Sequence, residues 1–379
     1  MKQSNTLMAL PLAVALIFLS LTGCKDRDKG DFVLGAVLAM TGDASKYGDQ
    51  MKEGMDLAVE EINQHGGING HPLKLVVEDC RADPKTAVSA FRKLTTFHQV
   101  PAVLSGISSV VVALAPVAPE SKVVLLNCAA VTPKIEGANH YTFSDLPNAK
   151  QEGAFLAESV FSRYPQKKVA IFWLNNETGL AMHDNFKDRL LKLGGQIVAD
   201  ETHEAGATDY RAQLLKIKST EPDVICMPTW SKEFGLAIKQ ARELGLGCQF
   251  FSIAAMENPE MLNIAGSAAE GVLYSYYSLN ENSPDATSRA FVGAYQKRYS
   301  RLPTVYNWTC YDGVYLVAEA LRHGADTGEK MADFWLKMPV YKGATGELKF
   351  SPSGAVTTAL RLKTVRNGKF AELPDKNGK

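Results

Sequence analysis

Two neighbouring serines, Ser108 and Ser109, lie where a short apolar stretch ends and a helical pattern begins. The first backbone N–H groups of a helix have no partner within the helix and carry a positive partial charge, so a carboxylate binds well there. We therefore expect the hydroxyl of Ser108 and the backbone around Ser109 to bind a carboxylate. The alternative is that Ser108 only caps the helix.

Motifs for catalysis or metal binding do not accompany these serines. The sequence has no GxSxG, HExxH or GxxxxGK motif, and its histidines are scattered without the spacing of metal ligands. These histidines are His65, His71, His98, His140, His183, His203 and His323. We expect a binding protein that is not an enzyme and holds no metal or cofactor. Turnover of a candidate ligand by the pure protein would instead favour an enzyme.

The elements that position the serines begin with a strand–helix–strand unit. The apolar run 32–40 predicts a buried strand, and the turn residues 41–43 end it. Helical spacing of apolar residues begins at Asp49 and stops at the glycines 66–67, before a second apolar run at 73–77. Two strands joined through a helix pair in parallel, so we expect a parallel sheet.

The same alternation continues in two blocks along the chain. In the first block we expect helices 84–99 and 110–118, strands 101–104 and 122–126, and an extended segment 141–147. In the second we expect helices 151–162, 180–193, 210–219 and 232–244 and strands 168–174, 196–199, 224–227, 249–253 and 271–278. Helices 286–299 and 309–324, strands 348–350 and 360–365 and a frayed tail 375–379 follow. The pattern predicts an α/β fold with two doubly wound parallel-sheet lobes.

Ligands of open parallel sheets bind beyond the carboxyl ends of the strands. This rule selects six loops, at residues 41–47, 105–109 and 127–132 in the first lobe and 175–178, 228–231 and 252–256 in the second. If the two sheets face each other, these loops converge on one cleft. The segments that connect the lobes would then act as a hinge, and a bound ligand would stabilise the closed state.

Composition narrows the class of partner. The 379 residues include 41 basic and 41 acidic residues, and 46% are hydrophobic. A neutral balance argues against a nucleic acid partner, and the apolar content suits a chain with a sizeable core. The length favours two domains.

The N-terminus has the features of a targeting segment. Lys2 precedes an apolar stretch at 7–21 and an LTGC motif that ends at Cys24, as in a lipoprotein signal peptide over residues 1–23. We expect export, a lipid on Cys24, and a charged tether at 24–30 that holds the protein at the membrane, in the periplasm or on the outer face of the cytoplasmic membrane. The alternatives are a plain secretory signal and a short membrane anchor, although the stretch is short for a spanning helix.

Five further cysteines follow Cys24, namely Cys80, Cys128, Cys226, Cys248 and Cys310. They are widely spaced and form no CxxC pair, so a zinc site is not expected. An exported protein could oxidise one pair of them, and the sequence leaves the pairing open.

Several motifs, in their order and spacing, resemble the type I periplasmic solute-binding proteins of ABC importers, and in particular the leucine/isoleucine/valine-binding branch. They are LAMTG, YGDQ, AVEEIN and GGINGHPLKLVVEDCRADP near the N-terminus, followed by QARELGL, NIAGSAAEGVL and GATGELKFSPSGA. The resemblance covers essentially the whole mature chain. It implies a three-segment hinge between lobe one, residues 31–147 and 280–355, and lobe two, residues 148–279 and 356–379. It also implies a monomer that delivers a branched-chain or other hydrophobic amino acid to an ABC permease, whereas a sensory module of the same fold is the alternative.

The resemblance implies roles for single residues as well. It assigns the carboxylate-binding serine to Ser108 and backbone contacts with carboxylate and ammonium to Ala129. It assigns a hydroxyl contact near Thr132, although the family's threonine falls one residue earlier, on Val131. Side chains of the cleft are implied at Tyr47, Trp230, Tyr306 and Thr178, the last where the family often has a tyrosine. For each aromatic residue the alternative is packing within its lobe.

One expected residue is missing. The amino-acid binders that this chain resembles have an acidic residue after the strand at 249–253, where it pairs with the ligand's ammonium, and here that position is Ala254. Burial of an ammonium without a carboxylate is costly. Either Glu257 or Asp145 substitutes for the acid, or the ligand is an aromatic or aliphatic carboxylate or an amide. We favour an amino acid because the other motifs do.

Overall fold

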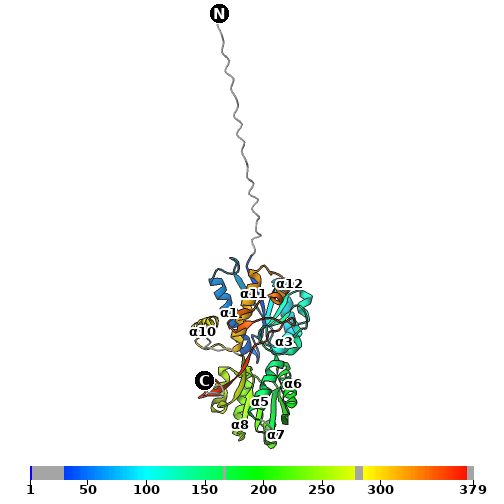
Figure 1. Ribbon diagram of the computed structural model, residues 1–379, viewed down its shortest axis with the longest axis vertical. Helices are drawn as coiled ribbons and strands as arrows, with labels where there is room; N and C mark the ends of the chain where they lie inside the picture. The colour runs from blue at the N-terminus through cyan, green and yellow to red at the C-terminus, as the bar shows by residue number, and fades with distance from the viewer. Residues whose placement is uncertain (2–29, 165–167, 278–284, 374–379) are drawn as a thin grey trace. The chain divides into compact units, whose positions relative to one another are not determined.

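The computed structural model describes residues 1, 30–164, 168–277 and 285–373 (Figure 1). The expected signal segment, Cys24 and the tail 375–379 therefore lie outside the described residues. The elements below all belong to the compact unit Asp31–Lys379.

A five-stranded parallel sheet forms the centre of lobe one, with the strand order β2-β1-β3-β4-β5. Its strands are β1 (Phe32–Leu38), β2 (Leu73–Asp79), β3 (Ala102–Ser105), β4 (Val124–Asn127) and β5 (Thr142–Ser144). The helices between them are α1 (Ser45–Gln64), α2 (Pro84–Phe97), α3 (Ser108–Leu114) and α4 (Val117–Ser121). The inner strands β3 and β4 are buried at every position, because helices cover both faces of the sheet.

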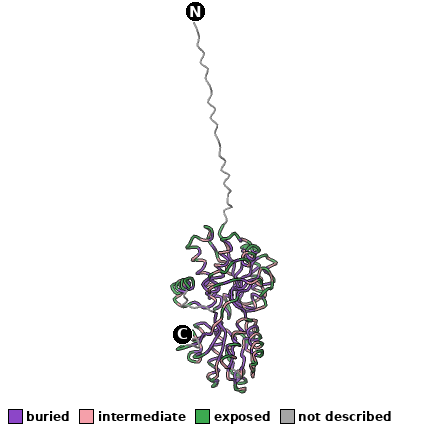
Figure 2. The backbone as a smooth tube through the Cα atoms, in the orientation of Figure 1, coloured by how far each residue is buried: buried purple, intermediate pink, exposed green. Residues whose placement is uncertain are grey.

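A seven-stranded sheet forms the centre of lobe two, in the order β14-β13-β10-β9-β8-β6-β7. Its parallel strands are β6 (Lys168–Leu174), β7 (Gln196–His203), β8 (Val224–Met227), β9 (Gln249–Ser252) and β10 (Leu273–Tyr277). The helices are α5 (Ala149–Arg163), α6 (Glu177–Lys192), α7 (Arg211–Ser219), α8 (Ser231–Glu243) and α9 (Pro259–Ala265). Figure 2 shows the buried chain along the sheets and the exposed chain on the outer helices and loops.

Two antiparallel strands, β13 (Leu360–Arg366) and β14 (Lys369–Glu372), extend this sheet beyond β10. The sequence analysis predicted a parallel sheet, whereas this one has an antiparallel edge. Asn367 and Gly368 connect the two strands with φ angles of 52° and 67°. An Asn-Gly pair is the usual sequence of such a two-residue hairpin turn, so this signal was present in the sequence.

The chain passes between the lobes three times, after β5, after β10 and before β13 (Figure 1). Between the second and third passages it adds helices and a hairpin to lobe one. These are helices α10 (Ala286–Tyr299), α11 (Val305–Arg322) and α12 (Gly328–Lys337) and a hairpin of β11 (Tyr341–Gly343) and β12 (Gly346–Leu348). The side chain of Asn307 in α11 donates to the carbonyl of Gln50 in α1 over 2.7 Å, which joins this late segment to the first helix.

Two predicted helix boundaries were wrong in ways that matter for the site. Helix α1 begins at Ser45 instead of Asp49, so Tyr47 belongs to its first turn and not to a loop. The next residue, Gly48, must be a glycine because a Cβ atom there would lie 1.9 Å from the carbonyl oxygen of Ala39. The predicted helix 110–118 is two short helices, since Pro116 lacks the N–H group that would continue α3.

Candidate ligand-binding cavity

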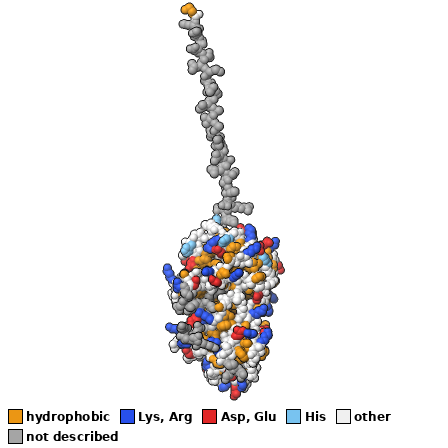
Figure 3. Space-filling view, in the orientation of Figure 1, with side chains coloured by type: hydrophobic (Ala, Val, Ile, Leu, Met, Phe, Trp, Pro, Cys, Tyr) orange, Lys and Arg blue, Asp and Glu red, His pale blue; other side chains and the backbone are white. Residues whose placement is uncertain are grey.

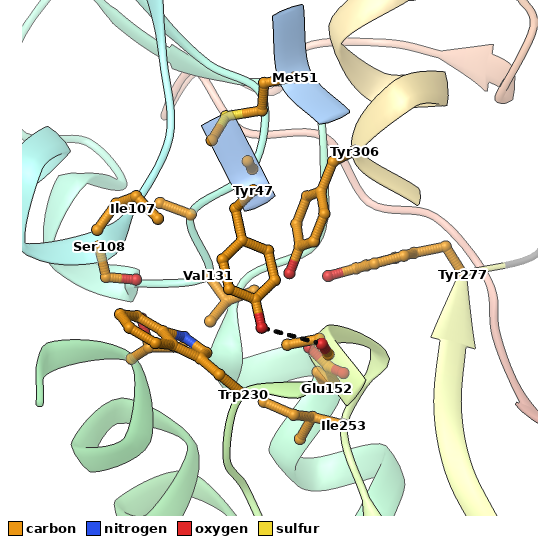
Figure 4. Close-up of a pocket in the computed structure, with 14 residues that line it drawn as sticks. Tyr47, Met51, Ile107, Ser108, Val131, Glu152, Trp230, Ile253, Tyr277 and Tyr306 are labelled. Atoms are coloured by element: carbon orange, nitrogen blue, oxygen red, sulfur yellow. Dashed lines mark hydrogen bonds between the residues drawn. The ribbon is translucent and has the colours of Figure 1, made fainter. Parts of the chain in front are cut away.

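A cavity lies between the lobes, at the place where the loops of both sheets meet (Figure 4). Lobe one contributes Tyr47, Met51, Ile107, Ser108, Ala129, Ala130, Val131 and Tyr306 to its wall. Lobe two contributes Glu152, Thr178, Trp230, Ile253, Ala255 and Tyr277. The wall is mostly apolar, and hydroxyl groups and one carboxylate interrupt it.

Six of the eight residues proposed from the sequence line this cavity, namely Tyr47, Ser108, Ala129, Thr178, Trp230 and Tyr306. Ser109 instead lines an adjoining hollow, which shares Ile107, Thr178 and Trp230 with the cavity. Thr132 lines neither of the two, whereas Val131, one residue earlier, lies in the cavity wall.

Thr132 takes part in a contact between the lobes. Its hydroxyl donates to Glu177 Oε1 in α6 over 3.1 Å, and Lys134 pairs with Glu177 Oε2 over 2.8 Å. Both contacts join the segment after β4 to lobe two, so they bring the lobes together outside the cavity.

The Ser108 side chain is fully buried, and its hydroxyl has no hydrogen-bond partner among the described residues. Ser108 is the first residue of α3, and Ile107 occupies the cap position with a φ of 64°. No side-chain cap bond forms there, so the alternative that Ser108 only caps this helix is wrong. In Figure 4 the Ser108 hydroxyl points into the cavity. Because a buried hydroxyl is rarely left unpaired, this atom is available to a ligand.

The loops on either side of Ser108 approach each other closely. A Cβ atom on Gly106 would lie 2.6 Å from the Ala129 Cβ and 2.6 Å from the Met51 Sδ. Glycine at this position therefore lets the tips of β3 and β4 and the first helix meet at one wall of the cavity.

Tyr47 crosses the cleft. Its hydroxyl accepts a hydrogen bond from the Ser231 backbone N–H over 2.9 Å and lies 3.3 Å from the Ala255 carbonyl oxygen, to which it donates. Its ring centroid lies 5.6 Å from that of Trp230 and 5.4 Å from that of Tyr306. Burial raises the pKa of the Tyr47 hydroxyl well above its usual value, so the group stays a neutral donor. The side chain thus connects lobe one to two loops of lobe two.

Glu152, which the sequence interpretation did not select, supplies the carboxylate of the cavity wall. Glu152 lies in the first turn of α5, whereas the sequence rule selected loops that follow strands. One signal was present, because Glu152 is in helical phase with the apolar residues Leu156 and Val160 and therefore belongs to the buried face. Burial raises the pKa of its carboxyl group.

Neither residue proposed to replace the missing acid lines the cavity. Glu257 is buried elsewhere in lobe two, where Lys363 Nζ lies 2.9 Å from it and the Tyr274 hydroxyl donates to it. Asp145 is buried within lobe one, where desolvation and the nearby Asp312 raise its pKa. The proposals for Glu257 and Asp145 were therefore wrong.

Other kinds of site receive no support from the described part of the chain. There, no three His, Cys, Asp or Glu side chains converge to hold a metal ion, and all five cysteines are free thiols. None of the described helices has both the length and the apolar character to cross a membrane. On the face in Figure 3, basic and acidic side chains are mixed.

Comparisons with known proteins agree with this architecture. The model of a family described as "Periplasmic binding protein" matches residues 32–369. A leucine-, isoleucine-, valine-, threonine- and alanine-binding protein of Pseudomonas aeruginosa is 25% identical over 83% of this chain and 84% of its own length.

Two solved structures are also similar. The branched-chain amino acid transporter substrate-binding protein LivJ from Streptococcus pneumoniae, in complex with isoleucine, has a TM-score of 0.84 and 27% identity, covering 90% of this chain and 99% of its own. A solute-binding protein of an ABC transporter from Rhodopseudomonas palustris, in complex with 3,4-dihydroxybenzoic acid, has a TM-score of 0.80 and 24% identity, covering 90% and 96%. At that identity the second likeness concerns the fold alone.

Proposed function

The chain belongs to the periplasmic binding protein family, and from that premise we propose that it is the solute receptor of an ABC importer. Its two lobes close on one small hydrophobic amino acid, branched-chain or similar, and present it to a membrane permease. The protein acts as a monomer, anchored by a lipid on Cys24. A Cys24→Ser variant that remained in the membrane fraction would contradict the lipid anchor.

One observation carries the ligand assignment: the unpaired, fully buried hydroxyl of Ser108 in the wall of a largely apolar cavity between the lobes. A small ligand with a carboxylate head and an apolar body would give this hydroxyl a partner and cover the apolar wall. The walls that Met51, Ile107 and Val131 form would enclose an aliphatic side chain. Both features also agree with the amino-acid ligands named for two of the similar proteins.

An aromatic or aliphatic carboxylate is the second candidate. Tyr47, Trp230, Tyr277 and Tyr306 surround the cavity with rings, which also suit an aromatic body. A protein of the same fold was crystallised with 3,4-dihydroxybenzoic acid. The same closed cavity would suit a sensory module, for which the partner would be a receptor instead of a permease.

A thermal-shift screen of amino acids, aromatic acids and amides tests the assignment. A ligand at about 100 times its dissociation constant stabilises the folded state by about 2.7 kcal/mol, which is readily measured as a rise in melting temperature. We expect the largest shift from a hydrophobic amino acid. If no compound of the three classes shifted the melting temperature, the proposed function would be wrong.

A further inference from the structure

The cavity wall contains a buried carboxylate, Glu152, that has no cationic partner in the described part of the chain. Glu152 is 1% exposed, and its Oε1 atom accepts from the Ala254 backbone N–H over 3.1 Å and from the Ser275 hydroxyl. Among the described residues no lysine, arginine or histidine forms an ion pair with it or shifts its pKa. Neutral donors hold the side chain in place, but they leave its charge uncompensated, which is costly in an apolar environment.

The titratable groups around Glu152 all stay neutral. The phenol of Tyr277, which bonds to the Glu152 carboxylate, the phenol of Tyr306 and the thiol of Cys226 face it from β10, α11 and β8. Burial raises the pKa of all three groups well above their usual values, so they stay neutral. Glu152 is therefore the group of this cluster that can carry a negative charge.

The two polar groups of the cavity differ in what they can bind. Ser108 contributes a neutral hydroxyl from lobe one, which can donate to a carboxylate. Glu152 contributes a carboxyl group from lobe two, and Figure 4 shows it in the wall together with Tyr277 and Tyr306. An ionised carboxylate attracts a cation and repels a second carboxylate, and the dry surroundings strengthen both effects.

We propose that Glu152 is the counter-ion of a positively charged group on the bound ligand, and that it makes this cavity specific for hydrophobic amino acids over carboxylates of the same carbon skeleton. The inference rests on the proposed function, since it concerns the same cavity. It also states a preference between the two ligand classes that the apolar walls alone accept equally.

Ligand binding must then be coupled to the ionisation of Glu152. In the free protein, burial favours the protonated carboxyl group, whereas an ammonium placed beside it favours the carboxylate. Affinity for an ammonium-bearing ligand should therefore rise as the pH rises through the pKa of Glu152 in the free protein. Affinity for a plain carboxylate should fall over the same range, because the ionised side chain repels it.

Isothermal titration calorimetry of the full-length protein tests the proposal with two probes that differ only in the ammonium, L-leucine and 4-methylpentanoate. The variants are Glu152→Gln, which keeps the shape and removes the charge, and Glu158→Gln as a control. Glu158 lies on the same helix but pairs with Arg189 at the surface. We expect Glu152→Gln to lower the affinity for L-leucine by roughly 100-fold or more, because the substitution removes one partner of a buried charge pair. The same variant should bind 4-methylpentanoate with equal or higher affinity than the wild type does. The control Glu158→Gln should change the affinity for neither probe.

Three results would count against the proposal, and they are distinguishable. If Glu152→Gln kept its leucine affinity, or if the wild type bound both probes equally, Glu152 would not be the counter-ion although solute binding would stand. If the wild type bound neither probe nor any other hydrophobic amino acid, the proposed function would fail as well. Should Glu152→Gln not fold, the wild type alone decides, because a leucine affinity that did not increase as the pH rises above 4.5, the ordinary pKa of a glutamate, would overturn the coupling.

Discussion

Glu152 and Glu257 are both buried glutamates of lobe two, yet their surroundings differ. Glu257 lies 2.9 Å from Lys363 Nζ, and that ammonium also lies 4.2 Å from the ring centroid of Tyr276. Glu152 has only neutral donors around it and faces a cavity. A buried carboxylate with its own cation completes a structural pair, whereas one without a cation beside an empty space can accept a cation from outside. Burial alone therefore does not identify a functional acid; Glu152 differs from Glu257 because it lines a cavity and forms no ion pair among the described residues.

Replacement of the two glutamates should separate stability from binding. Glu257→Gln removes the carboxylate beside the buried Lys363 ammonium, which should lower the free energy of unfolding by about 3–5 kcal/mol. Glu152→Gln breaks no ion pair among the described residues, so it should change the stability far less. Chemical denaturation of the two ligand-free variants measures this difference. Equal losses in both would show that Glu152 is as structural as Glu257.

The Ser108 hydroxyl should contribute to binding and little to folding, because it has no hydrogen-bond partner among the described residues. A hydrogen bond to a charged group contributes about 1.5–3 kcal/mol, so Ser108→Ala should weaken a carboxylate ligand by roughly 10- to 150-fold in calorimetric titrations. Ser105→Ala is the matched control. Its hydroxyl donates to the Val37 carbonyl over 2.7 Å, so its loss should lower stability by about 1 kcal/mol and spare affinity. An unchanged affinity in Ser108→Ala would remove this serine from the site.

Tyr47→Phe should have a smaller effect on the same measurement. The variant keeps the ring between Trp230 and Tyr306 and removes the hydroxyl that bonds to Ser231 and Ala255 across the cleft. One neutral hydrogen bond contributes about 0.5–1.5 kcal/mol, so ligand affinity should fall by roughly 2- to 10-fold through a less stable closed state. The Tyr164 hydroxyl bonds to Gln249 outside the cavity, so Tyr164→Phe should not change the ligand affinity. Faster ligand dissociation in stopped-flow measurements would support the role of Tyr47 in closure.

The strand-and-helix pattern was sufficient to predict the architecture and one part of the cavity. The loops that contain Ser108, Ala129, Thr178 and Trp230 were found because they follow strands, and parallel strands end at a common edge. The choice of Ala129, Thr178 and Trp230 within those loops came from the family resemblance. Glu152 was missed because its helix carries it into the cavity from outside the six loops. The rule states where loops converge, but it does not state which side chains of neighbouring helices reach the same space.

The wrong substitutes for the missing acid have a related cause. Glu257 is only a few residues from the expected position, but the short turn Ala254–Met256 directs it toward Tyr274 and Lys363, away from the cavity. Proximity along a chain does not fix the direction of a side chain after a turn. The pairing of Glu257 with Lys363 also depends on β13, which joins β10 from about a hundred residues later, and no local pattern shows that contact.

The smallest predicted effect is on the pH dependence of stability, and it tests the difference between the two glutamates without any ligand. Burial raises the folded-state pKa of Glu152 above its ordinary value of 4.5, so the folded protein holds this proton more tightly than the unfolded chain does. The carboxyl group therefore costs no stability below about pH 4.5, and it lowers stability as the pH rises through the folded pKa. Glu152→Gln removes this penalty, so the melting temperature of ligand-free wild type should fall relative to the variant between about pH 4.5 and 8. The raised pKa of Asp145 affects both proteins alike and cancels in the comparison. A constant difference across this range would mean that Glu152 is already ionised and compensated in the free protein.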